Sequence, residues 1–318
     1  MLLIGMDEAG YGPQLGPLCH GYCALRCPDG ADGAPDLYAL LHPAVMRHPA
    51  EPGRLTVDDS KKIYSRAAGL GLLRRGVTAF LNCLGPPSPP GDLYQGLLPA
   101  ADRAQLEADP WGLAQEPPGD EGEDFGAAQG LFLSEALQRN GIRVLAFGGR
   151  SLSARHFNAA LRSTQNKAEV SWSVIHAQCG ALLPLAAQGE RVHVVIDRQG
   201  GRKFYAAHLA RLFPGCMPWV EQENARESSY KIDAHGSAVR VTFVVEADGQ
   251  DLTVALGSMA AKLVRELCMQ RLNAFFRRFN KRLKPTAGYY GDAHRFLSQT
   301  RAVRRKLGIP DETLIREK

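Results

Sequence analysis

The chain has 318 residues, of which 45% are hydrophobic and 22% charged, a balance typical of a globular protein with one large domain or two small ones. No apolar stretch reaches the length of a membrane-spanning helix, so the sequence excludes that class. Seven cysteines, an odd number, and the lack of a visible signal peptide predict a cytoplasmic protein rather than a secreted disulfide scaffold.

The first predicted element is a buried strand over residues 2–6, "LLIGM", because this run is short and apolar. Asp7 and Glu8 follow directly, at the end of the strand where α/β proteins usually bind ligands. The glycines of the next stretch, "AGYGPQLGP", permit positive φ and close backbone approach. Two solvated acids at a capped strand end are the alternative interpretation of this pair taken alone.

A second apolar stretch covers residues 18–25, and apolar residues at helical spacing predict a helix from Ser65 to Leu81. Residues 86–130 are rich in Pro, Gly and acidic residues. Between Asp92 and Asp124 there are nine acids and a single basic residue. This composition predicts an insertion or mobile loop that stays outside the core.

Strands and helices alternate after the insertion, which predicts the α/β class. Residues 131–138 are predicted to be ordered again, followed by a strand, "IRVLAFGG", and a long helix over residues 168–187. The next strand, "RVHVVID", ends in Asp197. "YKIDAHGSAVRVTFVVEAD" then predicts two strands joined at residues 235–236, with Asp248 shortly after the second.

The last predicted helix, over residues 258–283, is amphipathic, with apolar positions three or four residues apart and a basic opposite face. From Lys262 to Lys306 there are 13 Lys or Arg residues and two acids. Such a segment indicates binding of nucleic acid or another polyanion. A merely solvated helix face is the alternative.

Four acids, three of them at the ends of apolar strands, form the candidate site: Asp7, Glu8, Asp197 and Asp248. If they converge in space, they cannot all stay ionised unless cations neutralise them. Mg²⁺ and Mn²⁺ prefer oxygen ligands of this kind. Two such ions can activate a water and stabilise the leaving oxygen in phosphodiester cleavage. No Walker loop, GxSxG motif or dinucleotide fingerprint competes with this interpretation.

Five motifs, in order, resemble those of the type 2 ribonucleases H. "GMDEAGYGPQLGP" is similar to the opening motif of that family, with Tyr11 where arginine is usual, and "DDSKK" to the DSKK that follows it. "VVIDRQGG", "EADGQDLTVALGSMAAKLVRE" and "GYYGDAH" resemble the later blocks. A further stretch, "HFNAALRSTQNKAEVSWSVIHAQ", is more similar to the ribonuclease HIII branch than to ribonuclease HII.

The resemblance implies that the four acids bind the metal and are catalytic. It implies that the backbone of the glycine loop, the stretch "AGYGPQLGP" at residues 9–17, meets a ribonucleotide 2′-hydroxyl at positions 10–12. It also implies that Lys61 and Lys62 lie near phosphates and that Tyr289 packs on the sugar at an RNA–DNA junction. The substrate-binding residues it assigns are Gly10, Tyr11, Gly12, Lys61, Lys62, Ser258 and Tyr289.

The expected architecture is a single ribonuclease H-like α/β domain over residues 1–318. It has a mixed sheet flanked by helices, an acidic insertion at 86–130 and a basic helical C-terminal segment at 258–318. The expected activity is Mg²⁺- or Mn²⁺-dependent hydrolysis of RNA in RNA–DNA hybrids, or at ribonucleotides embedded in DNA, leaving 5′-phosphates. No membrane and no obligate protein partner are expected. A ribonuclease HIII-like preference for longer RNA runs and a weakly catalytic hybrid-binding protein remain as alternatives.

Overall fold

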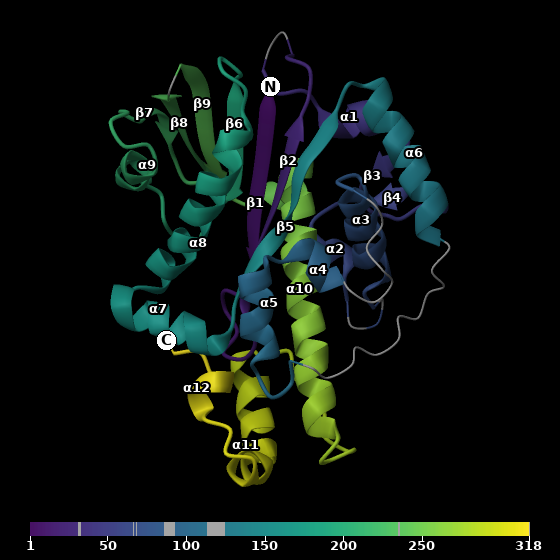
Figure 1. Ribbon diagram of the computed structural model, residues 1–318, viewed down its shortest axis with the longest axis vertical. Helices are drawn as coiled ribbons and strands as arrows, with labels where there is room; N and C mark the ends of the chain where they lie inside the picture. Colours follow the sequence, from purple (N-terminus) through teal and green to yellow (C-terminus); the bar gives the residue numbers. More distant parts are fainter. Residues whose placement is uncertain are drawn as a thin grey trace.

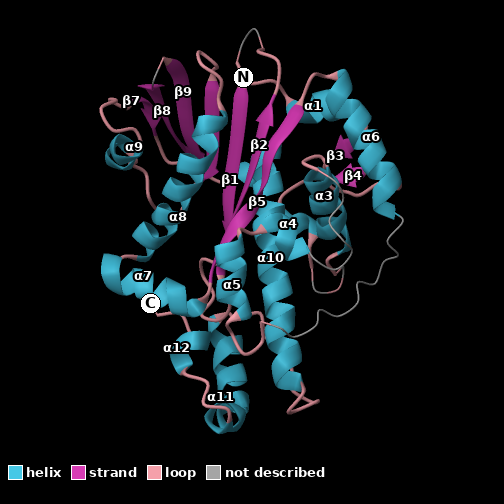
Figure 2. Cartoon of the chain, in the orientation of Figure 1, coloured by secondary structure: helices cyan, strands magenta, loops and turns pink. Residues whose placement is uncertain are grey.

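A computed structural model describes residues 1–30, 33–65, 67, 69–85, 93–112, 125–234 and 236–317. Its centre is a seven-stranded sheet whose strands lie in the order β5-β2-β1-β6-β9-β8-β7 (Figures 1 and 2). The strands, in that order, are Arg143–Leu152, Leu18–Arg26, Leu2–Ala9, Val192–Asp197, Ser237–Val244, Glu227–Ala234 and Trp219–Glu223.

The sheet is mixed, as the α/β prediction requires. β1, β6 and β9 run parallel to one another, and the other pairings are antiparallel. The hairpin predicted around residues 235–236 is confirmed by β8 and β9, whereas β7 had no counterpart in the sequence analysis. A separate pair of short strands, β3 (Val45–Met46) and β4 (Leu55–Thr56), lies outside the main sheet.

Alternating side chains of β1 enter two different cores, as the two-residue period of a strand requires. Leu3 packs with the apolar residues of helix α10 (Leu252–Arg277) on one face. Leu2 and Ile4 pack with α8 (Lys167–Leu182) and α9 (Ala206–Leu212) on the other face. The helices that join α10 in the first core include α1 (Leu37–Leu41), α3 (Gly71–Asn82) and α6 (Phe125–Arg139).

Further helices lie near the end of the sheet at which β1 and β6 terminate (Figure 1). They are α2 (Ser60–Ile63), α7 (Ala154–Thr164), α11 (Tyr290–Lys306) and α12 (Asp311–Leu314). Two 3₁₀ turns are η1 (Leu183–Leu185) and η2 (Ala247–Gly249). None of the helices in the described part of the chain combines the length and apolarity needed to cross a membrane.

Helix α10 lies unusually close to the sheet because glycines face it. A Cβ added at Gly21 in β2 would lie 1.9 Å from the carbonyl oxygen of Gly257. A Cβ added at Gly5 in β1 would lie 2.2 Å from the carbonyl carbon of Thr253. Side chains at these positions would force the helix away, so the glycines set the distance between α10 and β1.

The interpretation of residues 86–130 as a loop outside the core is wrong for residues 93–112. These form α4 (Leu93–Leu97) and α5 (Ala100–Glu107). Their apolar side chains, which a composition argument overlooks, enter the core: Tyr94, Leu97, Leu98 and Leu106. The remainder of the predicted insertion before α6, residues 86–92 and 113–124, lies outside the described residues.

Two helix predictions also need correction. The helix predicted from Ser65 to Leu81 begins later, at Gly71, and ends at Asn82 as α3, while the short helix α2 ends at Ile63, before the predicted start. The helix predicted over residues 258–283 begins earlier, where Asp251 caps α10 by accepting from the backbone N–H groups of Thr253 and Val254, and ends at Arg277. Most of α10 is buried, so its basic face is confined to the end of the helix and the residues that follow.

Candidate active site

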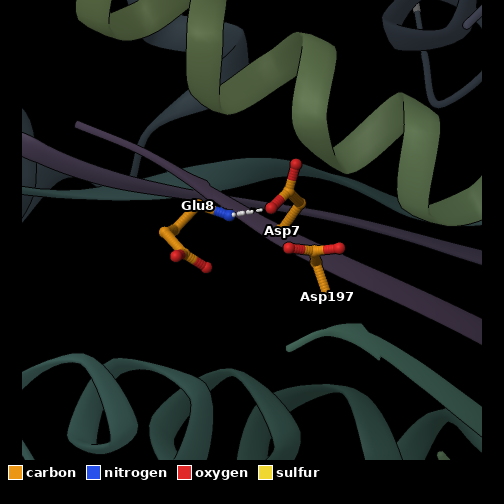
Figure 3. A group of neighbouring side chains, drawn as sticks. All are labelled: Asp7, Glu8 and Asp197. Carbon is orange, nitrogen blue, oxygen red and sulfur yellow. Dashed lines mark hydrogen bonds between the residues drawn. The ribbon is translucent and has the colours of Figure 1, made fainter. Parts of the chain in front are cut away.

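Three carboxylates converge where β1 and β6 end side by side. The parallel register pairs Met6 with Ile196, which brings Asp7 next to Asp197. One oxygen from each of Asp7, Glu8 and Asp197 can be chosen so that all three lie within 4.8 Å of one another. Figure 3 shows the three side chains around a common point, with the backbone N–H of Glu8 donating to Asp7 Oδ1 at 2.6 Å.

The fourth acid, Asp248, borders this group from the turn η2. The same turn fixes Asp197, whose Oδ1 accepts a hydrogen bond from the backbone N–H of Ala247 at 2.8 Å. Ser258 of α10 lies beside the acids: its hydroxyl donates to Asp248 Oδ2 at 3.3 Å, and Ser258 also lowers the pKa of Asp7. The parallel strands β1 and β6, which carry Asp7, Glu8 and Asp197, and the turn η2, which carries Asp248, therefore place all four predicted acids around one region.

Burial and mutual repulsion raise the pKa values of these acids. Burial, followed by the negative charges of Asp197, Glu8 and Asp248, raises the pKa of Asp7 well above its usual value. Burial and Asp197 raise the pKa of Glu8 to about 8. The pKa of Asp248 is raised to about 6, mainly by burial and by Asp59. Such a cluster favours neutralisation by a cation or by protons.

The two predicted lysines have different surroundings. Lys61 lies close enough to the acids to lower the pKa of Glu8 and Asp197. Burial opposes the charge of Lys61, but nearby carboxylates, Asp248 foremost, outweigh it and raise the pKa of Lys61. Lys62 instead donates to Asp58 Oδ1 at 3.0 Å and forms an ion pair with this buried acid.

The glycine loop and the predicted tyrosine lie beside each other. Gly10 has a φ of +88°, which glycine adopts without strain. A Cβ built on Gly12 would lie 4.0 Å from Tyr289 Cε1. Tyr289 is 58% exposed, so its ring is open to a ligand. Tyr11 is half-buried, and Lys167 Nζ lies 4.5 Å from the centroid of its ring.

Sequence reasoning missed three residues of this region. Gln199 lies close enough to Glu8 to lower its pKa and donates through Nε2 to Ser171 Oγ at 2.5 Å. Asp59 contacts Asp248, and Lys167 reaches Tyr11 from the start of α8. Gln199 follows Asp197 by two residues and Asp59 lies within "DDSKK", so proximity to a motif was the available signal. Lys167 carried no such signal.

No family model matches the chain, and no curated protein sequence matches it. Solved structures similar to it include ribonuclease HII of Archaeoglobus fulgidus, in a complex with PCNA, at 15% identity and a TM-score of 0.44, covering 100% of this chain and 95% of that one. Another is Bst-RNase HIII in complex with Mn²⁺, at 14% identity and a TM-score of 0.42; the match covers 99% of this chain and 66% of that one. Ribonuclease H2 of Pyrococcus horikoshii OT3 has 14% identity and a TM-score of 0.39, covering 99% and 92%.

These names agree with the family that the sequence motifs resemble. The identities and TM-scores are low, so the function proposed below rests on the residues of the site and not on these similarities.

Proposed function

We propose that the protein is a metal-dependent endonuclease of the ribonuclease H type, which hydrolyses RNA in RNA–DNA hybrids or at ribonucleotides embedded in DNA. The observation that carries the proposal is the convergence of Asp7, Glu8 and Asp197 within 4.8 Å, with Asp248 at the border. The proposed substrate comes from the five sequence motifs around these acids, which resemble those of the type 2 ribonucleases H and occur in the same order.

The donor set fits Mg²⁺ or Mn²⁺. The three convergent residues offer carboxylate oxygens and no nitrogen or sulfur, which is the ligand chemistry these cations prefer. Burial and the charge of Asp197 raise the pKa of Glu8 to about 8, and Lys61 offsets them only in part, so the site can accept further positive charge. Bound divalent ions would supply activation of water and stabilisation of the leaving oxygen. Asp7, Glu8, Asp197 and Asp248 are the residues proposed to hold them.

In the proposed reaction the oxygen of a water molecule bonds to phosphorus and loses a proton. The bond from phosphorus to the 3′-oxygen breaks, and that oxygen takes up a proton to become a 3′-hydroxyl. The other product carries a 5′-phosphate. Lys61, beside the acids, is proposed to hold a substrate phosphate, and the exposed ring of Tyr289 to pack on a sugar.

The glycine loop is proposed to distinguish RNA from DNA. A 2′-hydroxyl both donates and accepts hydrogen bonds, and a backbone without Cβ atoms can approach it closely. Gly10 and Gly12 provide such a backbone next to Tyr289. The basic residues that follow α10 are exposed and are proposed to bind phosphates further along the duplex.

The seven cysteines are all free, which supports a reducing compartment such as the cytoplasm.

A cleavage assay on three duplexes tests the proposal: a full RNA–DNA hybrid, DNA with one embedded ribonucleotide, and plain DNA, each with Mg²⁺ and with Mn²⁺. We expect cleavage of at least one ribonucleotide-containing duplex and none of plain DNA. Preference for the full hybrid would indicate a ribonuclease HIII-like enzyme. Binding of the hybrid without cleavage in the presence of either metal would refute the proposed enzymatic activity and favour a hybrid-binding protein.

A further inference from the structure

Residues 315–317, which we call the clasp, bind the glycine loop through backbone and side-chain hydrogen bonds. Leu15 and Ile315 form an antiparallel bridge, and the N–H of Arg316 donates to the carbonyl oxygen of Gln14 at 2.8 Å. Asn158 of α7 holds the clasp: it donates to the carbonyl oxygen of Ile315 and accepts from the N–H of Glu317, both at 2.8 Å. The loop is therefore tied through the clasp to the body of the protein.

Arg316 makes the central contact of the clasp. Its side chain is 3% exposed, and Nη2 donates to the carbonyl oxygens of Gly10 and Pro13. Its Cζ lies 5.0 Å from the ring centroid of Phe157. Among the described residues no carboxylate forms an ion pair with Arg316, and its Nε and Nη1 atoms have no hydrogen-bond partner. A buried cation without a counter-ion costs free energy, which favours a role for Arg316 in function rather than in stability.

A second buried arginine extends the same framework to Tyr289. Nη2 of Arg265 donates to the carbonyl oxygens of Leu15, at 3.3 Å, and of Ala287, at 3.0 Å. The N–H groups of Gln14 and Leu15 donate to the carbonyl oxygen of Gly288 at 2.8 and 3.2 Å. Gly288 immediately precedes Tyr289, so the loop and the exposed tyrosine are held at one spacing.

Peptide geometry turns the Arg316 contact into a statement about the loop's amides. In a trans peptide the carbonyl and the following N–H point in opposite directions. Because Arg316 holds the carbonyl oxygen of Gly10 toward the interior, the N–H of Tyr11 must point away from that arginine.

We propose that Arg316 is a positioning residue that aims the Tyr11 N–H at the ribose 2′-hydroxyl of the substrate. This inference rests on the proposed function, because it names the group that reads the ribonucleotide. It also assigns the clasp to the substrate site, although more than 300 positions separate Arg316 from Gly10.

The test uses the full chain with Arg316→Met and Arg316→Lys. Steady-state cleavage is measured on the single-ribonucleotide duplex, and amide hydrogen exchange is measured at Tyr11 and Gly12. We expect Arg316→Met to lower kcat/KM by about 10- to 100-fold, mostly through kcat, because a small displacement of a positioning group has this effect. Exchange at the two amides should accelerate. Arg316→Lys, which can still donate to the carbonyls, should recover part of both effects.

Arg162→Met is the matched control. Arg162 is exposed and donates to Glu317 Oε1 at 2.5 Å, so this variant loosens the clasp without touching the loop. We expect its kinetics to stay within about two-fold of wild type, since exposed ion pairs contribute little. A Mn²⁺ titration followed by melting temperature shows in every variant whether the acid cluster still binds the ion.

Wild-type kinetics and exchange in Arg316→Met would overturn the proposal, as would an equal loss of activity in Arg162→Met. If Arg316→Met fails to fold, the Arg316→Lys variant tests the positioning role instead. Unchanged amide exchange at Tyr11 and Gly12 together with an unchanged kcat in Arg316→Lys would reject that role. If the wild type cuts none of the duplexes, the proposed function fails, and amide exchange alone still shows whether Arg316 orders the loop.

Discussion

At the scale of single residues, the acid cluster is unfavourable in the metal-free protein. Asp7 is buried beside Glu8 and Asp197, and the positive charge of Lys61 offsets their repulsion only in part. Their raised pKa values reflect the electrostatic cost of burying these carboxylates together, which opposes folding. Relief of that cost should be measurable without any substrate.

The first prediction concerns Asp7→Asn and Asp197→Asn. Either change should abolish cleavage, because it removes a proposed metal ligand, while binding of the hybrid persists. In the metal-free protein Asp7→Asn should raise the free energy of unfolding by about 1 kcal/mol, because one repelling charge disappears from a buried cluster. Calorimetry in EDTA measures the effect. Asp233→Asn, the same change at an exposed acid, is the control and should alter neither property.

The second prediction concerns pH. The folded-state pKa of Glu8, about 8, exceeds its ordinary value of 4.5, so the folded protein binds the extra proton between these values. This proton on Glu8 stabilises the folded state; the stabilisation is complete below pH 4.5 and is lost as the pH rises through about 8. The melting temperature in EDTA should therefore fall across this window, and Glu8→Gln should flatten the decline. Saturating Mg²⁺ should raise the melting temperature most at the alkaline end; an equal shift at every pH would contradict the raised pKa.

The acids could be predicted because each signal was local: an apolar run followed by a carboxylate marks a strand end. Lys167 could not, because it lies far from every motif in the sequence and reaches Tyr11 through a tertiary contact. Arg316 was missed for the same reason, since nothing near "LIREK" indicates that its guanidinium faces a loop at the other end of the sequence.

At the scale of elements, α10 shows how periodicity misleads. Its spacing of apolar residues predicted a helix with a basic face, yet residues such as Ser258 and Arg265 are buried as well. A helix covered on most sides by the sheet and by other helices has no regular polar face. The exposed basic residues come at and after its end: Arg277, Arg278, Lys281 and Arg282.

The third prediction tests this basic segment. Replacing Arg278 and Lys281 by glutamine should weaken hybrid binding and reduce the slope of log K against log salt by about 0.9 for each phosphate that the protein no longer neutralises. Fluorescence anisotropy at several salt concentrations gives the slope. Arg139 and Arg143, exposed near the start of β5 at the opposite end of the sheet from Asp7, are the control pair. Equal slopes for both double variants would show that the segment is only solvated.

The fourth prediction concerns α5, which the sequence analysis placed in a loop. Asp102 is buried, and its carboxylate accepts from Arg150 Nε and from the backbone N–H of Ser151, each at 2.8 Å. Asp102→Ala should destabilise the protein by about 1–3 kcal/mol, because the buried N–H of Ser151 loses its acceptor, while the partly exposed Arg150 can be solvated. Urea unfolding measures the change. Glu107→Ala, at an exposed acid of the same helix, should be nearly neutral.

At the scale of the whole molecule, the sheet links distant parts of the chain. The alternation of elements predicted the α/β class and the mixed sheet, and the structure confirms both. The strand order and β7 were not predictable, because neighbouring strands such as β1 and β6 are brought together by contacts far apart in the sequence. Composition likewise could not reveal α4 and α5, whose few apolar residues are diluted by acids.

The fifth prediction is that the chain unfolds in one transition. The two large cores share β1 and β2, so neither can be lost without disturbing the other. Trp172 reports on the core beside α8, and Trp111 on a third cluster around Phe275 and Phe276. Tryptophan fluorescence and far-UV circular dichroism should therefore give the same urea midpoint. Separate midpoints would indicate two independent domains.

The contact between α10 and the sheet also constrains how the sequence can vary. Gly21 and Gly257 meet backbone to backbone, and a Cβ on Gly257 would also lie 3.4 Å from the backbone nitrogen of Asp7. Any larger residue there would push Ser258 and Asp248 away from Asp7. In a library randomised at both positions and selected for cleavage, active clones should retain glycine at each, because both lie in the contact between α10 and the sheet. This pair of glycines would then serve as a sequence marker for distant relatives whose acids alone are too few to recognise.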